Sequence, residues 1–152
     1  MVDIHHEGFA EAPLSVAFAY IDDTSNVPDW MFGISKFHAV DPANDHGLGA
    51  VYEGIFEVRP VKLKSVVEVT AWELDVHIEL TSIKGFKNSS TWRFTAAGPT
   101  RTKLQVTFSY ELPGGLAGRA LGRVMEPIVA LSVRHSDAAL RKHIEAAYVS
   151  GG

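Results

Sequence analysis

The central part of the chain, residues 49–111, alternates apolar and polar side chains with a period of two. Successive side chains of a strand point to opposite faces, so this pattern predicts antiparallel strands with one buried side and one solvent-facing side. Five strands fit the pattern, at residues 50–58, 62–71, 76–81, 91–95 and 103–111. Turn-forming sequences lie at residues 44–47, 84–85 and 97–100. Most of the core is therefore expected to form on one antiparallel sheet.

Aromatic side chains gather on the predicted buried face. They are Tyr52, Phe56, Trp92, Phe94, Phe108 and Tyr110. Such residues are usual core formers. Tyr52 and Tyr110 also carry hydroxyls that need partners when buried, and in an apolar pocket they would orient a carbonyl or a phenol. Asn88 and Ser90 fall on the same face as Trp92 and add polar groups to it.

Helical segments are expected on both sides of these strands. Residues 2–10 read as a strand, residues 14–21 as a short helix, residues 27–31 as a second helical turn and residues 37–40 as extended chain. After the Pro-Gly-Gly at residues 113–115, about thirty residues up to Ala147 read as one long helix. Pro127 removes a hydrogen bond inside it, which predicts a kink or two helical pieces.

A helical wheel of residues 127–147 divides the long helix into two faces. Arg134, Asp137, Arg141 and Glu145 form a charged stripe that is expected to face water. The opposite arc is wide and holds Met125, Ile128, Val129, Ser132, Val133, Ser136, Ala139, Leu140, His143 and Ile144. The residues at the centre of this arc have small side chains: Ser132, Ser136 and Ala139. A filled core favours larger side chains. Either a cavity lies there, or large sheet residues such as Trp92, Phe94 and Phe108 fill the space.

The seven histidines give no metal motif. His5 and His6 point to opposite faces of their strand, and no His-Glu-x-x-His spacing exists, so no zinc site is expected. His135 follows Ser132 by three residues but lies at the rim of the buried arc, where it is expected to meet solvent. His143 lies nearer the centre of the arc, where it is expected to face the cavity or to form hydrogen bonds in the core.

Composition narrows the class of protein. A chain of 152 residues fits one domain, spanning 1–152, and can bury roughly 70% of its unfolded surface. The net charge is −4 with scattered Lys and Arg, which argues against nucleic acid as a partner. Cysteine is absent, which is compatible with a reducing compartment. With no leader-like N-terminus and no run of ~20 apolar residues, we expect a cytoplasmic protein without membrane insertion.

The order of elements, a strand, two short helices, a run of antiparallel strands and a long helix, resembles the Bet v 1-like or START-like (SRPBCC) superfamily. Within it, the chain is most similar to the bacterial polyketide cyclase/dehydrase group. The resemblance rests on Ala12-Pro13 followed by Phe18, on Val27-Pro28-Asp29-Trp30, and on residues 113–119. It implies an α+β helix-grip fold, in which a curved seven-stranded antiparallel sheet surrounds the C-terminal helix and two short helices follow the first strand. A cavity would lie between the sheet and the long helix.

The resemblance leaves the function open between binding and catalysis, since family membership does not decide it. The leading hypothesis is binding of a hydrophobic small molecule, a lipid or a polyketide-like aromatic, by a monomer or homodimer. The alternatives are a cofactor-independent cyclase, aromatase or dehydratase, with Tyr52, Tyr110 and His143 as candidate acid and base, and a protein-interaction module using Leu116 to Val124. The expected ligand contacts are Trp30, Phe32, Tyr52, Phe56, Val67, Ile78, Ser90, Trp92, Phe108, Tyr110, Met125, Ile128, Ser132 and Ser136.

Overall fold

The computed structural model describes residues 2–31, 33–58, 61–111 and 115–151, and for some of these, most of them in the first half of the last helix, the backbone alone. Its elements follow the predicted order. They are β1 (Val2–Ala10), α1 (Leu14–Asp22), a 3₁₀ turn (Thr24–Asn26), α2 (Val27–Trp30), β2 (Ile34–Ala39), a 3₁₀ turn (Pro42–Asn44), β3 (Val51–Val58), β4 (Val61–Glu73), β5 (His77–Gly85), β6 (Lys87–Gly98), β7 (Arg101–Glu111) and α3 (Gly115–Gly151).

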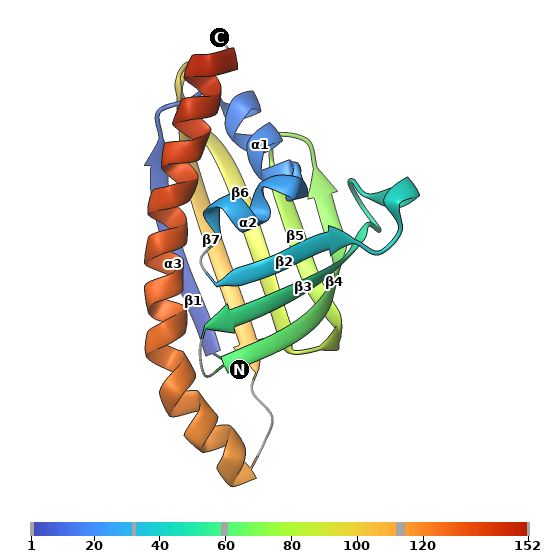
Figure 1. Ribbon diagram of the computed structural model, residues 1–152. Coiled ribbons are helices and arrows are strands. Elements are labelled where there is room, and N and C mark those ends of the chain that lie inside the picture. The colour runs from blue at the N-terminus through green and yellow to red at the C-terminus, as the bar shows by residue number, and fades with distance from the viewer. Residues whose placement is uncertain (1, 32, 59–60, 112–114, 152) are drawn as a thin grey trace.

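The strands form one antiparallel seven-stranded sheet in the order β1-β7-β6-β5-β4-β3-β2. The sheet curves, and Figure 1 shows α1 and α2 over one of its faces, with α3 running along β1 at one side. This arrangement confirms the helix-grip fold and the α+β class. In the part of the chain that the structure describes, no helix is long and apolar enough to cross a membrane.

Several boundaries differ from the predicted ones. β2 begins at Ile34, before the expected residue 37, and β5 and β6 extend to Gly85 and Gly98. The turn between β4 and β5 has no glycine or proline and was not predicted; Asp75 forms it with a φ of 61°. Aspartate tolerates this left-handed conformation better than most residues, which gives the turn its physical basis.

The long helix is continuous through Pro127. The sequence predicted either a kink or two separate helical pieces at Pro127. The second of these outcomes is wrong. Figure 1 shows the first turns of α3 at an angle to the rest, as a proline kink would produce.

A fully buried hydrogen bond anchors the link from β1 to α1. The Thr102 hydroxyl on β7 donates to the carbonyl oxygen of Ala12 at 2.8 Å, and both residues have no exposed surface. α1 then packs its apolar side onto the sheet, where the ring of Phe18 meets the ring of Phe94 edge-on at 5.0 Å between centroids. α1 therefore covers one end of the concave face in a fixed position.

Candidate functional site

A cavity of about 220 Å³ lies between the concave face of the sheet, α1, α2 and α3. Side chains from every strand of the sheet, from α1 and α2 and from the middle of α3 line it, and most are apolar. The residues of α3 in this wall, among those whose side chains are described, are Ser136, Asp137 and Leu140. The cavity thus lies between the sheet and α3; of the three small residues at the predicted centre, Ser136 is in the wall, Ala139 is not, and the side chain of Ser132 lies outside the described residues.

Strand register explains which side chains reach the cavity. His6 pairs with Val106 on β7, Val106 with Trp92 on β6, Trp92 with Ile78 on β5, and Ile78 with Trp72 on β4. Residues directly opposite one another in a sheet point to the same side. These five side chains therefore form one row across the concave face, and all five line the cavity.

Most of the predicted ligand contacts lie in this wall. Those that line the cavity are Trp30, Tyr52, Phe56, Val67, Ile78, Ser90, Trp92, Phe108 and Ser136. Phe32 lies outside the described residues, as do the side chains of Met125, Ile128 and Ser132. Contact with a ligand stays a prediction for all of them.

Two candidate residues lie outside the cavity wall, and for His143 the expected buried position is wrong. Tyr110 is 1% exposed and packs its ring against Phe86 and Phe108, and its contact with a ligand stays a prediction. His143 is exposed on α3 and stacks on Tyr20 with ring centroids 6.2 Å apart. Its neighbour Ile144 is fully buried instead, because successive helix positions are about 100° apart.

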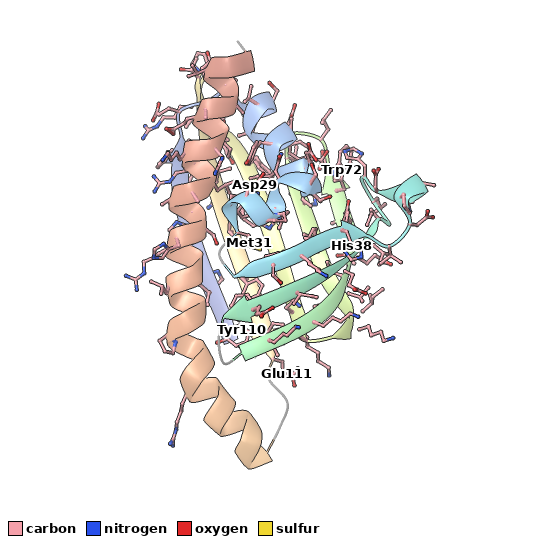
Figure 2. The ribbon with its side chains drawn as sticks, viewed as in Figure 1. Asp29, Met31, His38, Trp72, Tyr110 and Glu111 are labelled. Atoms are coloured by element: carbon pink, nitrogen blue, oxygen red, sulfur yellow. The ribbon has the colours of Figure 1, made fainter. Side chains whose placement is uncertain are left out.

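Several wall residues were not predicted from the sequence. Trp72 lines the cavity because β4 carries an irregularity between Val69 and Ala71, which shifts the alternation by one position. Figure 2 shows Met31 beneath α2 and Trp72 near the loop that joins β2 to β3. The sequence does contain a signal for His6, because it lies two positions after the apolar Ile4 on β1 and therefore on the same face of the strand. Asp137 was expected to face water, and that prediction is wrong: its side chain is 10% exposed and lies in the wall.

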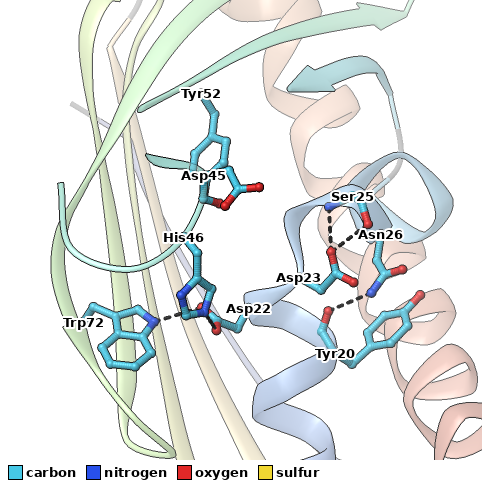
Figure 3. A network of polar contacts seen from close by, with 9 residues as sticks. All are labelled: Tyr20, Asp22, Asp23, Ser25, Asn26, Asp45, His46, Tyr52 and Trp72. Atoms are coloured by element: carbon cyan, nitrogen blue, oxygen red, sulfur yellow. Dashed lines mark hydrogen bonds and ion pairs between the residues drawn. The ribbon is translucent and has the colours of Figure 1, made fainter. Parts of the chain in front are cut away.

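Asp22 holds together one end of the cavity. Its Oδ1 accepts a hydrogen bond from Trp72 Nε1 at 2.8 Å, and its Oδ2 contacts Nε2 of His46 (Figure 3). His46 comes from the loop between β2 and β3, and its ring also meets the ring of Trp72 edge-on. Both carboxylate oxygens are therefore engaged, and they tie α1 to β4 and to the loop.

Tyr52, one of the three predicted acid-base candidates, already has a partner. Its hydroxyl donates to the carbonyl oxygen of Asp45 at 2.6 Å. Burial raises the pKa of Tyr52 above its ordinary value and the Asp22 carboxylate adds to the rise, while a hydrogen bond with the Thr24 side chain opposes it. The hydroxyl therefore stays protonated at neutral pH and acts here as a structural donor.

A second His-Asp pair lies in the opposite wall. Nε2 of His6 on β1 is 3.0 Å from Oδ2 of Asp137 on α3, and the same oxygen forms an ion pair with Nη2 of Arg141 at 2.8 Å. Gly8 makes room for this carboxylate, since a Cβ there would lie 3.1 Å from its Oδ1. Both His6 and Asp137 line the cavity, so an ionisable pair borders an otherwise apolar space.

The far end of the cavity is polar but internally satisfied. The Asn88 side-chain amide donates to Ser65 Oγ and to the carbonyl oxygen of Phe86, both at 2.9 Å. The Ser65 hydroxyl in turn donates to the Phe86 carbonyl at 3.0 Å. Among the residues that the structure describes, no group of three or more His, Asp or Glu side chains could hold a metal ion.

An apolar cavity enclosed by a curved sheet and a long C-terminal helix is the arrangement of a helix-grip domain. A family model described as "Polyketide cyclase / dehydrase and lipid transport" matches residues 1–145. The chain belongs to this family. No curated protein matches it by sequence.

Solved structures share the fold at low sequence identity. The protein TTHA0849 from Thermus thermophilus superposes with a TM-score of 0.81 at 18% identity, covering 96% of this chain and 99% of that one. A START superfamily protein from Mycobacterium smegmatis gives 0.74 at 17% identity, covering 95% and 97%. The Zhui aromatase/cyclase from Streptomyces sp. R1128 gives 0.74 at 16% identity, covering 95% and 93%. At such identities the likeness shows the fold alone.

Proposed function

We propose that this protein binds an apolar small molecule in the cavity between the sheet and α3. The observation that carries the proposal is the cavity itself, about 220 Å³ with a mostly apolar wall. Small-molecule sites have this character, an apolar enclosure with few polar groups. A cavity of ~150 Å³ accommodates benzene, so this one admits a compact ligand of roughly two rings.

Thermal unfolding in the presence of a two-ring aromatic tests the proposal. At a concentration of 2-acetylnaphthalene about 100 times its Kd, selective binding to the folded protein adds roughly 2.7 kcal/mol to the free energy of unfolding. For a chain of this length the melting temperature is expected to rise by roughly 5–10 °C. Native mass spectrometry of the purified protein would also show a compact ligand carried along. No shift with any two-ring aromatic and no co-purified ligand would count against the proposal.

A second candidate function is cofactor-independent cyclisation or dehydration, and the His6–Asp137 pair favours it. Such a reaction needs a base to remove a proton from carbon and an acid to return one to a leaving oxygen. Tyr52, Tyr110 and His143 do not converge on the cavity as a catalytic set, for the reasons given above. His6 and Asp137 do border it together.

Turnover of a short β-polyketone thioester separates catalysis from binding. His6→Gln is expected to lower turnover by roughly 100-fold, the usual contribution of one acid-base group, while 2-acetylnaphthalene still binds. His5→Gln is the matched control, because His5 lies on the opposite face of β1, where its Nδ1 meets Thr107 Oγ1 at 3.1 Å. Equal turnover in both variants would rule out His6 as the base.

The third hypothesis, a protein-interaction surface at Leu116 to Val124, concerns side chains that lie outside the described residues, apart from the exposed Arg123. No observation on the described residues favours it.

A further inference from the structure

Trp30 contributes to the cavity wall from α2. It is the last residue of α2, it is 4% exposed, and it lines the cavity. Its ring meets that of Trp92 at 5.4 Å between centroids and 81° between planes. Trp92 belongs to the row of side chains that crosses the concave face from His6 to Trp72. Trp30 therefore contacts this row at Trp92.

The indole nitrogen of Trp30 is buried and has no hydrogen-bond partner among the described residues. An unpaired buried donor is destabilising, and native proteins rarely leave one without a reason. Another indole of the same wall shows the contrast, since Trp72 donates its Nε1–H to Asp22.

Three other polar groups of the wall are already paired inside the protein, whereas Nε2 of His6 is buried without a hydrogen-bond partner in the described part of the chain and lies 3.0 Å from the Asp137 carboxylate as an ion pair. The Tyr52 hydroxyl, the Asn88 amide and the Ser65 hydroxyl each donate to a partner at 3.0 Å or less. An acceptor atom on a ligand would therefore find these donors committed. The N–H of Trp30 is a donor in the wall that a ligand can satisfy.

We propose that the ligand is an apolar molecule with an acceptor oxygen, such as an aromatic ketone, and that Trp30 Nε1–H donates a hydrogen bond to that oxygen. This inference rests on the proposed function. Nε1 has almost no exposed surface in the structure, so the proposal requires the indole to turn toward the ligand as it binds. α2 is only one helical turn long, and a small adjustment there suffices.

A pair of probes of nearly the same shape tests the inference. 2-Acetylnaphthalene carries C=O where 2-isopropenylnaphthalene carries C=CH₂, so the two differ mainly in the acceptor. The readout is the ratio of their Kd values, and its change between variants isolates the hydrogen bond from the packing of the rings. Trp30→Phe is expected to reduce the preference for the ketone by about 5-fold, the value of one neutral hydrogen bond.

Trp92→Phe is the matched control, because it trims a second indole of the same wall. It is expected to weaken the binding of both probes and to leave the ratio of their Kd values within about 2-fold of the wild-type ratio. A ratio that is the same in the wild-type protein and in Trp30→Phe would overturn the inference while leaving the proposed function intact. Failure of both probes to bind the wild-type protein would overturn both.

A spectroscopic readout on the wild-type protein does not depend on how the variants fold. In a ¹H–¹⁵N spectrum the three tryptophans give three indole signals, which the single Trp→Phe variants assign. The ketone is expected to move the Trp30 indole proton downfield, as a new hydrogen bond does, and the hydrocarbon is expected not to. Equal displacement by both probes would contradict a hydrogen bond at this atom.

Discussion

Gly85→Ala is expected to destabilise the protein by about 3 kcal/mol, the sum of a left-handed backbone penalty of roughly 1–2 kcal/mol and a steric clash of similar size. Gly85 ends β5 with a φ of +81°, and a Cβ there would lie 2.3 Å from the carbonyl oxygen of Lys64 on β4. That oxygen accepts the backbone N–H of Phe86 at 3.0 Å, so it cannot retreat without losing a bond. For this chain length the melting temperature is expected to fall by roughly 6–12 °C in thermal unfolding.

Gly49→Ala is the matched control for this prediction. Gly49 has a similar φ of +86°, but nothing lies within 4 Å of the position its Cβ would take. It therefore keeps the backbone penalty without the clash, and a loss of about 1–2 kcal/mol is expected. Equal losses in the two variants would show that β4 yields to the new methyl group.

The alternation of side chains was sufficient to predict the concave face. Ser90, Trp92 and Phe94 on β6 were assigned to one side from their spacing alone, and the register places Trp92 beside Val106 and Ile78 as that assignment requires. Such a prediction works because a slip of one residue would turn a whole buried face toward water. Sequence therefore determines the strand faces wherever the alternation is unbroken.

The alternation fails where the backbone departs from regular pairing. Trp72 was not placed in the wall because the irregularity after Val69 reverses the phase of the last residues of β4. Bulges of this kind have no strong local sequence signal. The error removed one large aromatic from the predicted cavity and left its hydrogen bond to Asp22 unforeseen.

The helical wheel of α3 gave a wrong prediction for Asp137 for a different reason. Asp137 and Arg141 look like a solvent-facing pair when α3 is considered alone. In the fold β1 lies beside this face, and His6 supplies a partner for the carboxylate from a residue far away in sequence. A charged residue tolerates burial when it is paired, and one helix cannot show its tertiary partners.

Ser90→Phe is expected to weaken ligand binding strongly without unfolding the protein. Ser90 lines the cavity from the middle of β6, between Leu80 on β5 and Phe108 on β7. A phenyl ring at this position enters the space that a two-ring ligand would use. If the ligand loses about 3 kcal/mol of apolar contact, the Kd of 2-acetylnaphthalene rises by roughly 100-fold in a titration.

Although its ligand binding weakens, the same variant is expected to be more stable than the wild-type protein. Filling a cavity commonly adds about 0.5–2 kcal/mol to the free energy of unfolding, so Ser90→Phe is expected to melt at a slightly higher temperature while its binding is weakened. Thr91→Phe places the same ring on the other face of β6, opposite Thr107 and Glu79, and is expected to bind the probe normally. A ligand bound anywhere else on the molecule would be unaffected by either change. Tight binding by Ser90→Phe would therefore place the site outside the cavity, whereas weakened binding with raised stability is a combination that only an occupied cavity explains.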